Sequence, residues 1–184
     1  MRKFVLVAVV LAAVVGASVA YSASSPSAKL QKQDRVWGGG DWSGGCSVND
    51  PSICIPNGRN VAVDAHAEGD GSDAAGNSAY AAFTSRSVTC LSVDGNTAAI
   101  GGVNIAGANV GWGYVEYFVD RGTTSPATVQ QDLGSLIYVI PLDDPSWPAG
   151  FPYVCPPAGG SPTLPPVYFE LDGGDIAVQD AAAS

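Results

Sequence analysis

Basic residues are scarce in this chain, and so are the side chains on which most catalytic motifs depend. Eight lysines and arginines stand against 17 aspartates and glutamates, and histidine occurs once. Such a chain lacks the basic footprint that nucleic acids and anionic lipids require, so no nucleic-acid partner is expected. No G-x-S-x-G or C-x-x-C motif is present, and no amphipathic pattern extends over a helix of about ten residues.

A long hydrophobic run is found at the N-terminus. Two basic residues follow Met1, an apolar stretch covers 4–15, and small residues continue to Ala20. This order predicts a signal peptide over 1–20, cleaved after Ala20 or alternatively after Ala23. The alternative is an uncleaved anchor, but the apolar run ends before the roughly 20 residues that a membrane span needs. We expect a secreted chain, extracellular or cell-wall associated, with no membrane span after cleavage.

Cleavage would remove two basic residues and leave six against 17 acidic ones, a net charge of about −11 for the mature chain. The mature chain would also hold all four cysteines, and an even count in an exported chain favours disulfides. Of the three pairings, one joins Cys46 to Cys54 across a short loop at low closure entropy, which leaves Cys90 to pair with Cys155. Metal ligation by the four thiolates is the alternative, without a C-x-x-C spacing to favour it.

Residues 21–57 are rich in serine, alanine, glycine and lysine. This composition predicts a flexible tether with a small disulfide loop, because it buries little apolar surface. Trp37 and Trp42 are its exceptions and could dock onto the domain that follows. We predict that domain over 58–181.

The predicted domain alternates with the period of two that is typical of strands. Asp94-Gly95-Asn96 predicts a hairpin, and Gly101-Gly102 predicts a bulge or barrel corner. Bulk on both faces of 112–120 predicts a strand covered on both sides. Nine of the 13 prolines lie in 141–166, which excludes regular ladders there. The predicted strands are 61–68, 79–84, 87–93, 97–105, 112–120, 136–140, 167–171 and 176–178, the last two as a final hairpin.

The pattern predicts an all-β fold after an N-terminal signal helix. Seven or eight short strands joined by tight turns make an antiparallel meander, which closes into a barrel or folds into a sandwich. We favour the barrel because the paired glycines supply a corner.

One set of segments carries a family resemblance. These segments are RSVTCLSVDGNTAAIGG over 86–102, the aromatic strand with Asp120-Arg121-Gly122, the Cys155-Pro156-Pro157 segment and GDIAVQDA over 174–181. They resemble a family of exported proteins of unknown function from high-GC Gram-positive bacteria, over roughly residues 58–181. The resemblance implies a Cys90–Cys155 bridge, with Cys46 and Cys54 as a local addition. It implies no activity.

Two catalytic arrangements are conceivable. A Ser-His-Asp site would need His66, which lies beside Asp64 and Glu68 on the polar face of a predicted strand. A glycoside hydrolase would need two carboxylates, such as Glu116 and Glu170 facing a barrel lumen. The alternative is that His66 and the two glutamates are strand residues without a catalytic role.

Two binding arrangements are also conceivable. Acidic loops could supply oxygen ligands to Ca²⁺, although aspartate also serves turns for backbone reasons. The candidate ligands are Asp70, Asp73, Asp172 and Asp175. Aromatic side chains could line a ligand cavity, or simply fill the core. The candidates are Trp112, Tyr114, Phe118 and Tyr138.

We therefore expect a secreted, non-enzymatic binding or structural β module whose partner is an extracellular ligand or protein. No cofactor is expected apart from calcium. The alternatives are a small extracellular hydrolase and a calcium-binding β domain.

Overall fold

The chain folds into an all-β protein. A computed structural model describes residues 33–42, 44–56, 58–69, 71, 73–80, 85–122 and 131–182. The predicted signal peptide and Asp70 lie outside these ranges. No helix within the ranges is long and apolar enough to cross a membrane.

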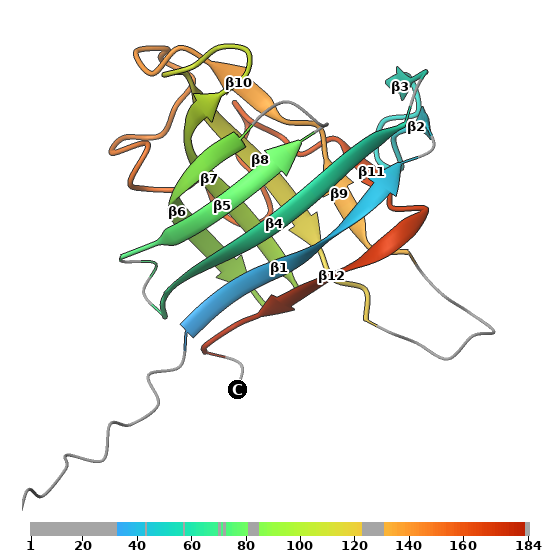
Figure 1. Ribbon diagram of the computed structural model, residues 1–184, viewed down its shortest axis with the longest axis horizontal. Coiled ribbons are helices and arrows are strands. Elements are labelled where there is room, and N and C mark those ends of the chain that lie inside the picture. The colour runs from blue at the N-terminus through green and yellow to red at the C-terminus, as the bar shows by residue number, and fades with distance from the viewer. Residues whose placement is uncertain are drawn as a thin grey trace, which may run out of the picture.

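Most of the strands belong to one curled antiparallel sheet, a half-barrel (Figure 1). Its order is β11-β9-β8-β7-β6-β5-β4-β1-β12, with β10 paired to β8 off this path, and β2 and β3 form a separate ribbon. The prediction of an all-β antiparallel fold is confirmed, but the described strands outnumber the seven or eight predicted. They are β1 (Gln33–Trp42), β2 (Gly45–Cys46), β3 (Cys54–Ile55), β4 (Arg59–Glu68), β5 (Ala75–Tyr80), β6 (Ser85–Asp94), β7 (Thr97–Ala106), β8 (Gly113–Val119), β9 (Leu133–Ser135), β10 (Tyr138–Ile140), β11 (Tyr168–Glu170) and β12 (Gly173–Gln179).

The sheet begins earlier than the sequence analysis predicted. Residues 33–42, assigned above to a tether, form β1, which pairs with β4 on one side and β12 on the other. Val36 and Trp42 are buried in the core. Those two apolar anchors, with a full backbone ladder on both sides, order a glycine-rich segment whose composition alone predicted disorder.

The central meander matches the predicted pattern. Along β4, every second residue from Val61 to Ala67 is buried and the residues between are more exposed. β6 and β7 form the predicted hairpin through a turn at Gly95 and Asn96. The ladder is irregular between Val88 and Cys90, opposite the paired glycines, as predicted. The second predicted strand, 79–84, is placed too late, since β5 spans Ala75–Tyr80.

The inner face of the sheet encloses the main hydrophobic core. This core is built from alternate residues of the curled strands, among them Val36, Val63, Ile100, Phe118 and Ile176. Burial of these side chains stabilises the curl, at roughly 25 cal/mol per Å² of apolar area removed from water.

A second cluster covers the outer face of β7 and β8. It joins Val115 and Tyr117 to Trp147 and Leu164 from the proline-rich segment over 141–166. The rings of Trp147 and Phe151 stack with centroids 3.9 Å apart. Because the main core and this second cluster pack on opposite faces of β8, every residue from Gly113 to Phe118 is buried. This confirms the prediction that the strand is covered on both sides.

Both predicted disulfides are present. Cys90 on β6 is bonded to Cys155 in the proline-rich segment, and Cys46 is bonded to Cys54. The Cys90–Cys155 bond fixes the proline-rich segment over 141–166, which we call the outer layer, to the sheet. Two disulfides indicate an oxidising environment outside the cytoplasm, and they exclude metal ligation by these four cysteines.

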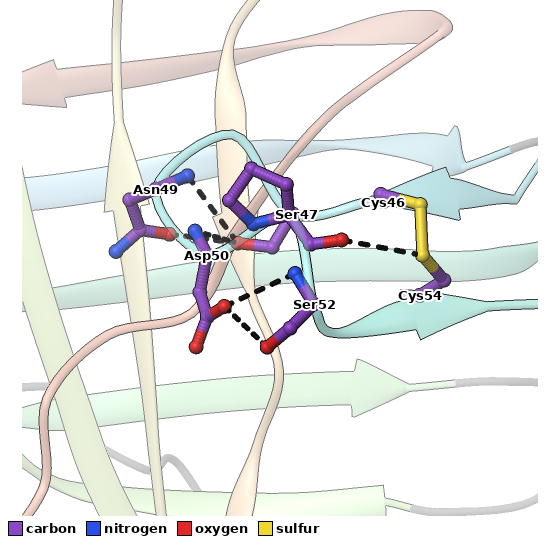
Figure 2. The surroundings of a disulfide bond; sticks show 7 residues. Cys46, Ser47, Asn49, Asp50, Ser52 and Cys54 are labelled. Carbon is purple, nitrogen blue, oxygen red and sulfur yellow. Dashed lines mark hydrogen bonds between the residues drawn. A yellow bond between two sulfur atoms is a disulfide. The ribbon is translucent and has the colours of Figure 1, made fainter.

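The Cys46–Cys54 loop is held by short side chains (Figure 2). The Ser47 hydroxyl donates to Asn49 Oδ1 at 2.8 Å, and Asp50 Oδ1 accepts from the Ser52 amide at 3.1 Å. Asn49 also donates to the Pro166 carbonyl and accepts from the Tyr168 amide, at 2.7 and 2.9 Å. The loop is thereby docked beside β11.

The predicted final hairpin is wrong. β11 pairs with β9 and β12 pairs with β1, so Leu171 and Asp172 carry the chain from one end of the sheet path to the other, and residues 173–175 of the predicted turn belong to β12. Glycines at a turn signal a change of direction but do not specify which strand lies beside the next one.

Aspartate side chains bridge the seam between β12 and the ends of β8 and β9. Asp132 Oδ2 accepts from the Ile176 amide at 2.8 Å, and Asp120 Oδ2 accepts from the Val178 amide at 3.1 Å. These two amides are two residues apart on the side of β12 that faces away from β1. Carboxylates thus replace a backbone ladder at this seam.

Replacing Asp132 with asparagine tests the seam. Asp132 is buried and also accepts from the Arg121 amide at 2.8 Å, so asparagine keeps one acceptor and turns an N–H group toward the other donor. We expect the free energy of unfolding to fall by about 1–3 kcal/mol in urea denaturation. Asp143→Asn is the matched control, because it makes the same change at an exposed carboxylate away from the seam. Equal losses in both variants would contradict a bridging role for Asp132.

Candidate functional site

Adjacent inner strands bring polar side chains together inside the half-barrel. Cross-strand pairing places Arg86 of β6 opposite Ser78 of β5 and Asn104 of β7. Tyr114 and Glu116 come from β8, which pairs with β7. All five are buried, and together we call them the interior cluster.

Two hydrogen bonds organise the interior cluster. Arg86 Nε donates to Asn104 Oδ1 at 3.0 Å. The Ser78 hydroxyl donates to Glu116 Oε2 at 3.1 Å. Polar groups in a dry interior are costly unless bonded, so these contacts fix the orientations of Arg86 and Glu116.

Aromatic rings flank the guanidinium group of Arg86. Its carbon lies 5.3 Å from the ring centroid of Tyr114 and 5.5 Å from that of Tyr80, which are cation–π distances. Tyr80 in turn lies 5.5 Å from the ring of Trp42. Tyr80 therefore connects the interior cluster to Trp42 at the end of β1.

Burial changes the titration of these groups. It raises the pKa of Glu116 to about 8, although the positive charge of Arg86 and the hydrogen bond from Ser78 oppose the rise. Burial also lowers the pKa of Arg86 and raises the pKa of Tyr114. At neutral pH, Glu116 is mainly a neutral acid beside a guanidinium cation.

Four buried polar atoms of this region have no hydrogen-bond partner among the described residues. They are Trp42 Nε1, Arg86 Nη1, Tyr114 OH and Glu116 Oε1. A buried donor or acceptor without a partner costs about 1–3 kcal/mol, more when charged. Four such atoms in one aromatic-lined region mark it as the strongest candidate for a binding site in the described part of the chain.

A cleft of about 210 Å³ adjoins the region at Trp42. The docked Cys46–Cys54 loop and β11 contribute its other walls, through Val48 and Phe169 among others. A larger groove, of about 440 Å³, is lined by the exposed Tyr153 and Val154, and none of the four side chains above contributes to it. Trp42 therefore links this cleft to the interior region, and Ser78 of the interior cluster also lines a separate groove of about 440 Å³.

The predicted aromatic set is divided among three places. Tyr114 and Phe118 face the main core. Tyr138 packs in the outer cluster and donates to the Pro165 carbonyl, and Trp112 is 39% exposed before β8. The four do not line one cavity, because Trp112 lies before β8 begins and is exposed, and Tyr138 belongs to a different strand, opposite Val115.

The predicted calcium ligands are also dispersed. Asp73 is exposed in the turn before β5, whereas Asp172 and Asp175 are exposed at the start of β12. No group of three or more histidine, cysteine, aspartate or glutamate residues within the described ranges could hold a metal ion.

The catalytic candidates do not assemble either. His66 is exposed on β4, and the Asp64 beside it is ion-paired with Arg35 at 3.1 Å. Glu116 is fully buried, whereas Glu170 is exposed and ion-paired with Arg121 at 3.2 Å. These two glutamates therefore do not face one bond from two sides, as glycoside hydrolysis requires.

Sequence reasoning missed Arg86, Ser78, Asn104 and Trp42 as site residues. A signal was available for Arg86, which shares the inward face of its strand with Val88. A charged residue at an inward position is an exception that calls for an explanation. Trp42 was predicted only as a residue of the tether that could dock onto the domain, and it is indeed buried, but no site role was predicted for it.

Comparisons with protein-family models, with curated proteins and with solved structures return no match for this chain.

Proposed function

We propose that this protein is an exported, non-enzymatic binding module. Its binding region consists of the interior cluster and the cleft beside Trp42. The observation that carries the proposal is the set of four buried polar atoms without partners, all in one region. A ligand that supplies their hydrogen bonds would be favoured by the desolvation cost already present in the free protein.

Export rests on two independent features. The N-terminal order of basic, apolar and small residues is that of a signal peptide. Two disulfides fit the oxidising conditions that an exported chain meets. The absence of an assembled set of catalytic side chains in the described ranges favours binding over hydrolysis.

Ligand binding can be followed through side-chain N–H signals in NMR. We expect small polar fragments at millimolar concentration, namely glycerol, urea, imidazole and acetate, to shift the Trp42 indole and Arg86 Nε–H signals with at least one of them. The Trp147 indole serves as an internal control, because it donates to the Pro141 carbonyl in the outer layer. If all four fragments leave the Trp42 and Arg86 signals unchanged, the region is a structural core and the proposal fails.

A further inference from the structure

Hydrogen-bond donors predominate among the four unpartnered atoms. Trp42 Nε1 and Arg86 Nη1 can only donate, and the Tyr114 hydroxyl can donate. Glu116 Oε1 belongs to a carboxyl group that is mainly protonated at neutral pH. A ligand that satisfies this region must therefore offer acceptors.

The region also carries the positive charge of Arg86, which forms no ion pair with the described residues. The ion pairs among them are Arg35–Asp64 and Arg121–Glu170, neither of which involves Arg86. Arg86 instead donates to the neutral amide of Asn104 and lies close to two aromatic rings. One buried positive charge beside a neutral acid favours a ligand with one negative charge.

The burial and geometry of the region also limit the size and shape of the ligand. The side chains that hold the four atoms are at most 3% exposed, so the group they contact must be small. Arg86 lies at cation–π distance from Tyr80 and Tyr114, and its Nη1 has no partner, which is the kind of donor through which arginine binds planar carboxylates. Building on the proposed function, we propose that the interior cluster binds one small carboxylate against Arg86 and Tyr114.

Carboxylate binding is coupled to the protonation of Glu116. A bound anion disfavours ionisation of Glu116, and ionised Glu116 supplies the negative charge that the ligand would otherwise bring. The other groups facing Glu116 are Arg86, Ser78, Tyr80 and Tyr114, and burial raises the pKa of both tyrosines, so they stay neutral. Arg59, at the exposed start of β4, acts on Tyr80 from outside.

The experiment compares sodium acetate with acetamide, its neutral analogue of similar shape, at constant ionic strength. Shifts of the Arg86 Nε–H signal in the disulfide-bonded protein report binding. At pH 6.5 we expect acetate to bind and acetamide not to bind. At pH 9.5 we expect acetate affinity to fall about tenfold or more, because Glu116 is then mainly ionised.

Three variants separate the contributions. Glu116→Gln keeps a neutral acceptor for Ser78, so its acetate affinity should be the same at both pH values. Glu170→Gln makes the same chemical change at an exposed site and should keep the pH dependence of the unmodified protein. Tyr114→Phe keeps the ring over Arg86 and removes a hydroxyl without a partner. It should bind acetate several-fold more weakly without loss of stability, an outcome that a purely structural hydroxyl would not give.

The outcomes distinguish the two proposals. Equal shifts with acetate and acetamide would overturn the carboxylate inference and leave a neutral-ligand site in place. If neither compound shifts the signals but glycerol, urea or imidazole does, the carboxylate inference is likewise overturned and the proposed binding function stands. No shift with any of these probes would overturn the proposed function as well.

Discussion

Removing the Cys90–Cys155 bond is expected to destabilise the protein more than removing the Cys46–Cys54 bond. The first closes 65 residues of chain and the second closes eight. Loop-closure entropy predicts losses of about 4 kcal/mol and about 2.5 kcal/mol in the free energy of unfolding. The longer bond also fixes the outer layer, where Thr89 Oγ1 donates to the Pro152 carbonyl at 2.6 Å.

The comparison uses two matched double variants, Cys90→Ala with Cys155→Ala, and Cys46→Ala with Cys54→Ala. Guanidinium denaturation under non-reducing conditions measures the stability of each. Limited proteolysis should cut 141–166 faster in the first variant only, because that segment would lose its covalent attachment. A first variant as stable as the second would show that packing alone holds the outer layer.

The stability of the protein should depend on pH through Glu116, and Glu116→Gln should remove that dependence. Burial raises the pKa of Glu116 to about 8 in the folded protein, from an ordinary value of 4.5 for the exposed side chain. Well below pH 4.5 the folded and unfolded chains are both protonated at this residue and there is no penalty. Between pH 4.5 and 8 the unfolded chain releases the proton while the folded protein retains it, so folding becomes less favourable as the pH rises. Above pH 8 the penalty is complete.

The size of this effect follows from the pKa difference. At about 1.4 kcal/mol for each tenfold change in an equilibrium constant, the complete penalty is on the order of 5 kcal/mol. We expect Glu116→Gln to match the unmodified protein near pH 4 and to exceed it by this order above pH 8, in urea denaturation at a series of pH values. Glu170→Gln, exposed and ion-paired to Arg121, should follow the unmodified profile. Parallel profiles for the unmodified protein and Glu116→Gln would show that Glu116 ionises normally.

The local pattern predicted most of the central sheet. β4, β6, β7 and β8 follow the period of two closely, and a two-residue turn with Gly95 specifies the β6–β7 hairpin. These features depend on neighbours in sequence, which composition and periodicity describe well. The disulfide pairing followed from loop length and was also implied by the family resemblance.

Long-range pairing was not predictable in the same way. β1 is glycine-rich, and it is ordered by β4 and β12, from distant parts of the chain. The partner of β12 depends on how the whole sheet curls and not on the short connection between β11 and β12.

The candidate site illustrates the same limit. Tyr114 and Glu116 were singled out from one aromatic strand, whereas Arg86 and Asn104 became site residues only through register. A bulge between Val88 and Cys90 shifts that register, and a shift of one residue changes which side chains face inward.

The aspartate seam also affects how the sheet meets other chains. A strand at the end of a sheet usually presents free N–H groups that can template pairing with a second molecule, and aggregation begins there. In β12 the Ile176 and Val178 amides are already bonded to Asp132 and Asp120. An incoming strand would find these donors occupied and carboxylates in front of them. The half-barrel thus protects its edge against strand addition without closing its backbone ladder.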